Sequence, residues 1–298
     1  MKKLTSEDIK EFVSRPLFDE KVIFNKDPSW PKISIITPSY NQGQFLEDTI
    51  LSVLNQNYPN LEYIITDGGS TDGSVEIIKK YEKYITYWVS EPDRGQSHAL
   101  NKGLVKATGD WIGWQNSDDV YLQECFNNFV NIIKKYPQYD VIFGNKVVIH
   151  EDSNINTCKI QLYFPSDTSI YVNTGMTMCN QSSFIRRIIF SEYGLLDEQL
   201  DFAMDHDFFL RLLVNNVNIF HSPMILGASR YHDGSKSCSE NEKAWSEEII
   251  SINDKYGLIR TNKYKVKFLK LYRYFLMARY NRSHFLKEIL KRLMLVQL

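Results

Sequence analysis

The chain has 298 residues, of which 43% are hydrophobic and 24% are charged, and its formal net charge is −1. A chain of this length forms one large domain or two small ones, and this composition is that of a globular protein. A net charge near zero excludes a general electrostatic attraction to nucleic acid or to a membrane surface.

The amino-terminal segment and the cysteines favour a cytoplasmic protein. The start, MKKLTSEDIKEF, is charged and lacks the apolar region of a signal peptide. No uncharged apolar run reaches the roughly 18 residues that span a bilayer. The four cysteines are scattered without a C-x-x-C spacing, so neither a zinc cluster nor a disulfide framework is expected.

Strands and helices are predicted to alternate after a polar stretch at residues 1–30. Short apolar strands are predicted at 33–36, 61–66, 87–89 and 111–114, and helices at 44–56, 74–84, 97–107 and 121–136. This order is typical of a mostly parallel, doubly wound α/β sheet. Beyond residue 139 the order is irregular, with a β stretch at 141–149, a helix after Asp205 and a last strand near 225–231.

Polar side chains follow all four strands of the regular part. The segments at 37–41, 67–70, 91–95 and 116–119 carry hydrogen-bonding or charged groups, whereas the strands themselves are apolar. Ligands of open α/β sheets bind beyond the carboxyl ends of the strands. Polar loops alone would account for one or two such ends, so four of four favour a binding site.

The residues at these strand ends indicate a nucleotide and a metal ion. Asp118 and Asp119 are adjacent hard oxygen donors, which suit Mg²⁺ or Mn²⁺. Neither a P-loop nor a G-x-G-x-x-G dinucleotide motif follows the first strand. A nucleotide bound through a metal without either glycine motif fits a nucleotide-sugar enzyme.

Two long segments resemble family 2 glycosyltransferases of the GT-A fold. The first is ISIITPSYNQGQFLEDTILSVLNQNYPNLEYIITDGGSTDGS, and the second is SEPDRGQSHALNKGLVKATGDWIGWQNSDD. Shorter matches follow at 180–187, 205–212 and 230–237. The resemblance implies a GT-A (nucleotide-diphospho-sugar transferase) domain at 31–237. Outside it, the polar residues 1–30 are expected to form an arm and residues 238–298 an added basic helical segment.

The resemblance also implies a donor site for the nucleotide. Thr37, Pro38 and Tyr40 occupy the positions that surround the base and ribose in the family. Asp67 matches the carboxylate that accepts a hydrogen bond from uracil, which favours a UDP-sugar as donor. Arg94 is expected either to meet the base or diphosphate or to form a surface ion pair.

The family's D-x-D metal motif is altered in this chain, where it reads Asn116-Ser117-Asp118. The resemblance implies that Asp118 binds Mn²⁺ or Mg²⁺ and that Asn116 hydrogen-bonds the ribose. Asp119 is expected to orient the metal ligand or to face the sugar. The alternative is that Asp118 and Asp119 cap the helix predicted near residue 121.

Further site residues are implied by the weaker matches. In the segment Asp205-His206-Asp207, Asp207 is expected to be the general base, with Asp205 as the second candidate. The alternative is that both aspartates stabilise the positive end of a helix. His232 is expected to complete the metal shell, or else to be an ordinary packed residue, and Gln181 to face the acceptor or to pack as a buried amide.

These assignments imply an inverting, metal-dependent hexosyltransferase. A sugar would pass from a nucleotide diphosphate to a hydroxyl of a glycan or lipid-linked acceptor, in the synthesis of a bacterial surface polysaccharide such as O-antigen or capsule. Two other functions stay open from the sequence alone: a sugar-nucleotide pyrophosphorylase, and a non-catalytic carbohydrate- or nucleotide-binding module of the same fold.

The carboxyl-terminal tail is strongly basic. Residues 261–298 carry ten Lys or Arg and one Glu, so the tail has a net charge of +9 and the rest of the chain −10. Apolar residues recur in the tail at helical spacing: Phe268, Leu271, Phe275, Leu286, Ile289, Leu290 and Leu293. The tail is expected either to lie on the inner, anionic face of the membrane or to pack on the catalytic domain. Nucleic acid is not expected as a partner, because no recognition motif accompanies the charge.

Overall fold

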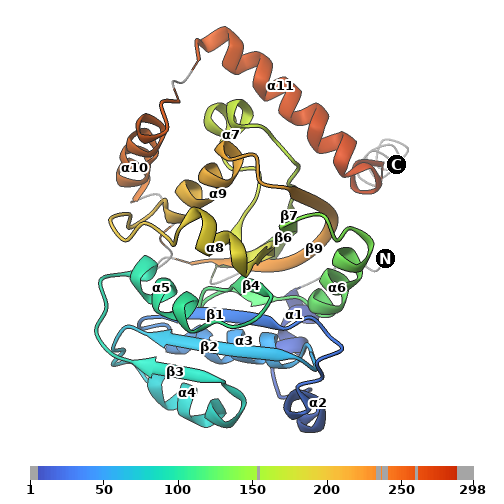
Figure 1. The fold of residues 1–298 in the computed structure, drawn as a ribbon, viewed down its shortest axis with the longest axis vertical. Coiled ribbons are helices and arrows are strands. Elements are labelled where there is room, and N and C mark those ends of the chain that lie inside the picture. The colour runs from blue at the N-terminus through green and yellow to red at the C-terminus, as the bar shows by residue number, and fades with distance from the viewer. Residues whose placement is uncertain (1–5, 153–154, 233–235, 237–240, 259–260, 287–298) are drawn as a thin grey trace.

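The computed structural model describes residues 6–152, 155–232, 236, 241–258 and 261–286. At its centre is a nine-stranded mixed sheet in the order β3-β2-β1-β4-β8-β6-β9-β5, with β7 paired to β6. Helices cover this sheet on both faces (Figure 1).

The first half of the sheet is parallel, as the sequence predicts. It contains the strands β1 (Ile33–Ser39), β2 (Leu61–Asp67), β3 (Tyr87–Ser90) and β4 (Trp111–Trp114). The helices α3 (Gly43–Leu54), α4 (Ser74–Tyr81) and α5 (Gln96–Lys106) connect them. Successive strand residues point to opposite faces, so Ile35 packs in the core cluster that contains α3, and Ile36 packs in the cluster that contains α5.

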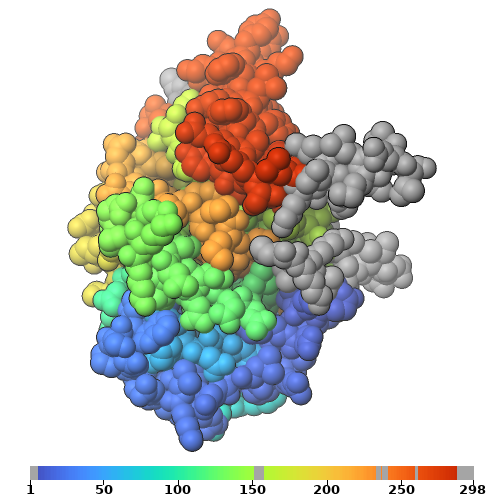
Figure 2. All heavy atoms as spheres, turned by 90° about the vertical axis from the view of Figure 1, so that its right-hand side faces the viewer, coloured from blue at the N-terminus to red at the C-terminus, as the bar shows by residue number. Residues whose placement is uncertain are grey.

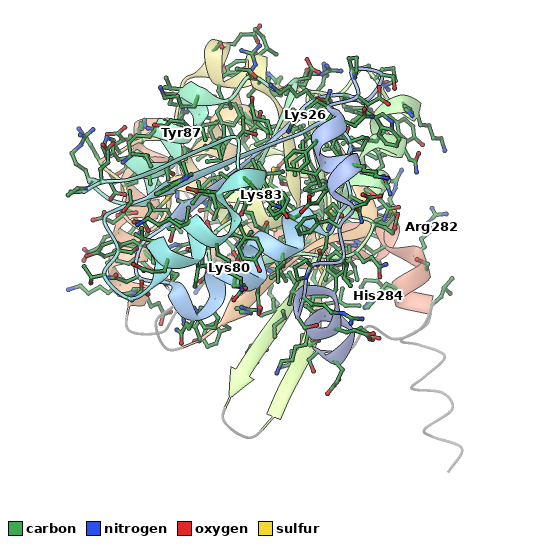
Figure 3. The ribbon with its side chains drawn as sticks, turned by 90° about the horizontal axis from the view of Figure 1, so that it is seen from below. Lys26, Lys80, Lys83, Tyr87, Arg282 and His284 are labelled. Atoms are coloured by element: carbon green, nitrogen blue, oxygen red, sulfur yellow. The ribbon has the colours of Figure 1, made fainter. Side chains whose placement is uncertain are left out.

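The second half of the sheet is mixed rather than parallel. Its strands are β5 (Val120–Tyr121), β6 (Val141–Asp152), β7 (Ile155–Gln161), β8 (Ser183–Arg186) and β9 (Ile219–Tyr231). Strand β8 runs antiparallel to both β4 and β6, whereas β6 and β9 are parallel. Strands β6 and β7 form a hairpin that extends beyond the body of the protein (Figure 3).

Four helices accompany this mixed half along the chain: α6 (Cys125–Lys135), α7 (Thr168–Thr174), α8 (Arg187–Tyr193) and α9 (Met204–Val214), with the 3₁₀ turn η2 (Asn180–Ser182) before β8. A second 3₁₀ turn, η1 (Glu82–Tyr84), follows α4 in the parallel half. Five of the elements are not predicted from the sequence: β5, β7, β8, α7 and α8. These elements have two to seven residues each and lack the regular alternation of apolar strands with longer helices that identifies the equally short strands β3 and β4.

The amino-terminal arm contains two helices, α1 (Ser6–Val13) and α2 (Glu20–Asn25). Ile9, Phe12 and Val13 of α1 are buried in a cluster with residues of β5, β6 and β9. The side chain of Asn55, just after α3, accepts from the backbone N–H of Leu17 at 2.7 Å and donates to the carbonyl of Phe12 at 2.6 Å. The arm is therefore fixed to the domain by both apolar packing and hydrogen bonds.

The carboxyl-terminal region contains α10 (Glu242–Lys255) and the long basic helix α11 (Lys263–Tyr280). Leu269 and Leu276 of α11 pack against Phe164 and Ile170, so one face of the helix is attached beside α7. The rest of α11 lies at the surface, at one end of the molecule (Figure 2). The predicted helical positions 289, 290 and 293 lie outside the described residues. Among the helices that the structure describes, none combines the length and apolarity that crossing a membrane requires.

A buried carboxylate ties the amino ends of the central strands together. Glu62 of β2 is 4% exposed and accepts hydrogen bonds from three residues: Lys32 Nζ at 2.6 Å, Ser34 Oγ, and Thr108 N and Oγ1, both at 2.7 Å. Burial alone would raise the pKa of Glu62, but these hydrogen bonds lower it to about 2. The ionised form of Glu62 therefore stabilises the fold.

We expect Glu62→Gln to lower the free energy of unfolding by about 2 kcal/mol at pH 7, because hydrogen bonds to a charged partner are lost. The pKa of Glu62 is lower in the folded state than in the unfolded chain, where it is about 4.3. Its contribution is therefore complete above about pH 4.3 and declines as the pH falls towards 2. Urea unfolding at pH 7 and pH 3 measures this, and an equal difference between wild type and variant at both pH values would contradict it.

Candidate active site

A cavity of about 1140 Å³ lies beyond the carboxyl ends of the parallel strands. This is where the sequence predicts a ligand, because parallel strands end at the same edge of a sheet. Its volume is ample for a nucleotide-sized ligand. Site residues predicted from the sequence that line this cavity are Pro38, Tyr40, Asn116, Asp118, Asp119, Gln181 and Asp205.

A tight turn after β4 presents the altered metal motif to the cavity. The backbone N–H of Asp119 donates to the carbonyl of Asn116 at 3.1 Å, and Asn116 Nδ2 donates to Asp119 Oδ2 at 3.0 Å. The other side of the Asn116 amide is also engaged, since Oδ1 accepts from Gln96 Nε2 and from Trp114 Nε1, both at 2.8 Å. The turn is therefore closed by one backbone bond and one side-chain bond.

Asp119 is 2% exposed and its carboxylate accepts hydrogen bonds from three protein groups. Besides Asn116, it accepts from Gln181 Nε2 at 2.9 Å and from the backbone N–H of Arg230 at 3.0 Å. Burial and the neighbouring Asp118 raise the pKa of Asp119 to about 7, while the hydrogen bonds from Gln181 and Arg230 act in the opposite direction. This carboxylate therefore joins three segments of the protein and is surrounded by donors, unlike Asp118.

Asp118 and His232 converge on the other side of the turn. Asp118 Oδ2 lies 3.2 Å from His232 Nε2, and the imidazole packs on Phe45 with ring centroids 4.6 Å apart. One carboxylate oxygen and one imidazole nitrogen at this spacing are a suitable donor pair for Mn²⁺. Within the described part of the chain no group of three or more His, Cys, Asp or Glu gathers for a metal, so further ligands would come from phosphate or water.

The two aspartates of α9 lie in different environments. Asp205 lines the cavity, and burial raises its pKa to about 6. Asp207 is 0% exposed, does not line the cavity, and accepts from Arg211 at 2.6 Å and from Lys255 and Tyr256 at 3.1 Å. Residues two apart on a helix point about 200° apart, so the two cannot share one site. The preference for Asp207 over Asp205 is not supported by this geometry.

Asp67 shapes the glycine loop rather than facing the cavity. Its carboxylate accepts from the backbone N–H groups of Gly69 and Ser70 at 3.1 and 2.9 Å and from the hydroxyls of Ser70 and Ser90 at 2.6 Å. Gly68 and Gly69 line the cavity instead. A Cβ on Gly68 would lie 2.6 Å from an Asp93 side-chain oxygen, so a larger residue there would require Asp93 to move. Gly69 has a φ of +86°, which strains any residue other than glycine.

Of the other residues predicted to bind the donor nucleotide, some line the cavity and some lie outside it. Pro38 lines the cavity, and Tyr40 stands at its mouth with 60% of its surface exposed. Thr37 is buried and its hydroxyl lies 3.2 Å from the Tyr63 hydroxyl. Arg94 is paired with Glu198 and does not line the cavity, which matches the surface ion pair considered from the sequence.

Several cavity residues are not identified by the sequence analysis. Asn180 is 4% exposed, and its Nδ2 has no hydrogen-bond partner among the described residues. Four cations also line the cavity: Lys146, Arg230, Lys236 and Arg273. The signal for Lys146 is the polar pair Asn145-Lys146 inside the apolar stretch VIFGNKVVI, and Arg273 carries no local signal because it comes from the distant helix α11.

Comparison with known proteins gives matches in both sequence and fold. The profile of "Glycosyl transferase family 2" matches residues 34–194. An uncharacterized glycosyltransferase of Rickettsia typhi is 29% identical over 228 residues, which are 72% of this chain and 71% of that protein. TuaG of Bacillus subtilis, whose name refers to teichuronic acid biosynthesis, is 40% identical over 99 residues, 32% of this chain and 38% of TuaG.

Two solved structures share the fold. Staphylococcus aureus TarS residues 1–349, in complex with UDP-GlcNAc, matches with a TM-score of 0.61 and 18% identity over 85% of this chain and 72% of TarS. The mannosyltransferase PcManGT of Pyrobaculum calidifontis, in complex with GDP-Man and Mn²⁺, matches with a TM-score of 0.55 and 16% identity over 86% of this chain and 70% of PcManGT. With the family profile covering more than half of the chain, this protein belongs to glycosyltransferase family 2 and is a transferase of the GT-A fold.

Proposed function

We propose that this protein is an inverting, metal-dependent glycosyltransferase that uses a UDP-sugar and a glycan or lipid-linked acceptor in surface polysaccharide synthesis. The observation that carries the proposal is that two carboxylates, Asp118 and the half-buried Asp205, line one cavity, and that Asp118 lies 3.2 Å from the imidazole of His232 just outside its lining. The complex of TarS with UDP-GlcNAc supports a nucleotide-sugar donor, and the name of TuaG supports a polysaccharide product. Family membership argues against the pyrophosphorylase alternative.

Asp205 is the proposed general base. As the acceptor oxygen attacks the anomeric carbon of the sugar, its proton passes to the Asp205 carboxylate, and the bond between that carbon and the diphosphate oxygen breaks. Attack from the face opposite the leaving group inverts the configuration. A pKa near 6 gives this base more proton affinity than an exposed aspartate has, while leaving it ionised at neutral pH. The Nδ2 group of Asn180, without a partner among the described residues, can donate to a sugar or acceptor hydroxyl.

Asp118 and His232 are the proposed protein ligands of Mn²⁺ or Mg²⁺. The Mn²⁺ complex of PcManGT supports a divalent ion in this fold. A bound ion would stabilise the negative charge that develops on the departing diphosphate. On the nucleotide side, Pro38, Tyr40 and the glycine loop after Asp67 provide the surface for the base and ribose.

Helix α11 is the proposed site of contact with an anionic membrane surface. It carries six Lys or Arg and no acidic residue, and its exposed apolar residues include Tyr264, Phe268, Leu271, Tyr272, Tyr274 and Phe275. Basic residues beside exposed aromatic ones suit the headgroup region of a bilayer. Arg273 of the same helix lines the cavity, so a lipid-linked acceptor at the membrane would lie close to the site.

We expect Asp205→Asn to reduce kcat by about 10²–10⁴-fold without changing the Kd for UDP, because only proton transfer is lost. In the wild type, kcat/KM is expected to rise with pH up to about 6 and then to level off, since the base acts in its ionised form.

Asp207→Asn is the matched control for Asp205→Asn. It should instead lower stability by about 3 kcal/mol, because the buried partner charge of Arg211 loses its carboxylate. Loss of catalysis in a stably folded Asp207→Asn protein, with activity retained in Asp205→Asn, would reverse the assignment.

Removing the charge of Asp118 is expected to abolish the metal dependence of UDP binding. By calorimetry, the wild type should bind UDP at least about tenfold more tightly with Mn²⁺ than with EDTA, a difference of about 1.4 kcal/mol. The Asp118→Asn variant should bind equally weakly under both conditions. Metal-dependent binding that survives in this variant would exclude Asp118 as a ligand.

Charge reversal on α11 is expected to weaken binding to anionic vesicles. Lys263, Lys265, Lys267 and Lys270 are all exposed, and each contributes about 1 kcal/mol near an anionic surface. Their joint replacement by Glu should abolish co-sedimentation with phosphatidylglycerol vesicles. The same change at four exposed lysines elsewhere, Lys21, Lys79, Lys134 and Lys159, is the control for net charge. Equal loss in both variants, or no binding by the wild type, would contradict the membrane role of α11.

A further inference from the structure

The amide at position 116 occupies the place of the first aspartate in the D-x-D pattern. Its hydrogen bonds show what this replacement achieves in the fold. Oδ1 accepts from Gln96 and Trp114, and Nδ2 donates to Asp119. The Asn116 side chain thus acts as an acceptor on one side and as a donor on the other, which a carboxylate cannot do.

The donor function is required by Asp119. The Asp119 carboxylate is an acceptor when ionised, and it lies 3.0 Å from Asn116 Nδ2 at a nearly fully buried position. An aspartate at position 116 would place a second carboxylate at this distance. Two carboxylates so close cannot both be ionised without strong repulsion. Position 116 and Asp119 are therefore a complementary pair in which one member must donate.

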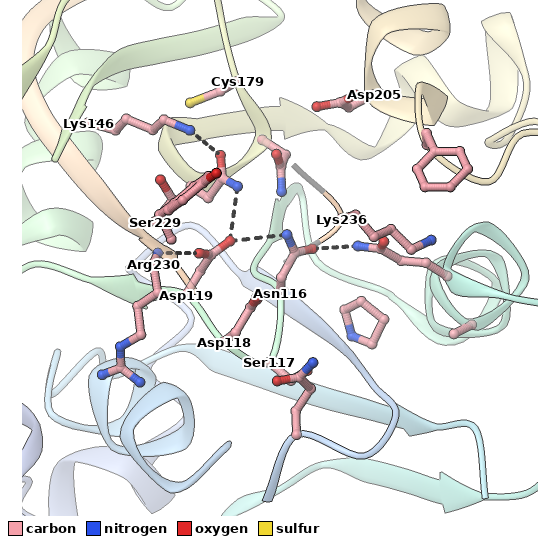
Figure 4. Close-up of a pocket in the computed structure, with 18 of the residues that line it drawn as sticks. Asn116, Ser117, Asp118, Asp119, Lys146, Cys179, Asp205, Ser229, Arg230 and Lys236 are labelled. Carbon is pink, nitrogen blue, oxygen red and sulfur yellow. Dashed lines mark hydrogen bonds between the residues drawn. The ribbon is translucent and has the colours of Figure 1, made fainter. Parts of the chain in front are cut away.

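The pair also determines where Asp118 lies. Asn116 and Asp119 close the turn by two hydrogen bonds, and Asp118 is inside that turn, 3.2 Å from His232. On the far side, Gln181 donates to Asp119 and accepts from Lys146 Nζ at 3.4 Å (Figure 4). A continuous series of hydrogen bonds thus crosses the cavity floor from Lys146 to Gln96 and fixes the orientation of both amides, Gln181 and Asn116.

We propose that Asn116 is a positioning residue whose amide donates to Asp119 and thereby places Asp118 for the donor diphosphate. It is not a weakened metal ligand. The part concerning Asp118 and the diphosphate rests on the proposed function. Asn116→Asp, which recreates D-x-D, should therefore impair the site rather than improve it, and adding Asp119→Asn should repair it in part.

The test is a double-mutant cycle with Asn116→Asp, Asp119→Asn and the double variant. Two quantities are measured for each protein: the Tm without ligand, and the Kd for UDP in Mn²⁺ by calorimetry. Asn116→Asp should lower the Tm by about 2 °C or more and raise the Kd about tenfold or more, equivalent to one pKa unit of repulsion. The double variant keeps the net charge and one donor between the two positions, so it should recover part of both losses; the recovery is incomplete because the amide nitrogen at position 119 then faces the donor Gln181 Nε2. Asn25→Asp, at an exposed residue of α2, is the control for an added charge.

Two results would overturn the proposal. One is a Kd for UDP in Asn116→Asp that equals or is lower than that of the wild type, which would mean that the amide is a weakened ligand. The other is a double variant whose Tm and Kd for UDP are no closer to the wild-type values than those of Asn116→Asp. That result would mean that a hydrogen-bond donor between positions 116 and 119 does not stabilise the site. If the wild type itself does not bind UDP, the proposed UDP-sugar function fails. The Tm cycle still tests the hydrogen bond between positions 116 and 119, because it needs no nucleotide.

Discussion

The site depends on the hydrogen bonds that the buried carboxylate of Asp119 accepts. The carboxylate receives hydrogen bonds from Asn116 at the end of β4, from Gln181 in η2 before β8, and from the backbone of Arg230 in β9. These segments belong to the parallel and the mixed halves of the sheet. One acceptor group therefore joins the two halves at the point where the cavity forms.

Close backbone contacts support the same junction. A Cβ on Gly227 of β9 would lie 1.9 Å from the carbonyl oxygen of Gln181, so only glycine permits η2 and β9 to approach this closely. Thr49 of α3 donates to the carbonyl of Asp119 at 2.7 Å. The guanidinium of Arg230 forms an ion pair with Asp48 and lies 5.1 Å from the centre of the Phe45 ring. The imidazole of His232, which follows β9, also packs on Phe45. Helix α3 therefore positions both the end of β9 and the His232 side chain.

The sequence predicts the parallel half of the fold well because each strand there is an apolar run followed by an amphipathic helix. The polar strand ends follow from the same regularity, and their pattern alone is enough to locate the cavity. The mixed half is not predictable in this way. Strands β5 and β8 have two and four residues and gain their stability from neighbours that are distant in the chain. Local periodicity contains no information about such pairing.

The individual roles in the site show a similar limit. The resemblance identifies the segment 205–207 but not which aspartate faces the cavity, because that depends on the rotation of α9 and on the partners Arg211 and Lys255. It also assigns Asp67 to the base, whereas the fold engages its carboxylate with four donors of the glycine loop and β3. Lys146, Asn180 and Arg273 reach the cavity only through tertiary contacts. Residue type and spacing suggest chemistry, but the available hydrogen-bond partners decide which group remains open to a ligand.

The most direct test of this account is anomalous diffraction at the manganese edge from crystals grown with UDP and Mn²⁺. The account predicts a single manganese peak bounded by the Asp118 carboxylate and the His232 imidazole, next to the diphosphate, with Asp119 still bonded to Asn116 and Gln181. A manganese ion bound by Asp119 or by position 116, or a diphosphate held by the cations at Lys146 and Arg273 without metal, would contradict it.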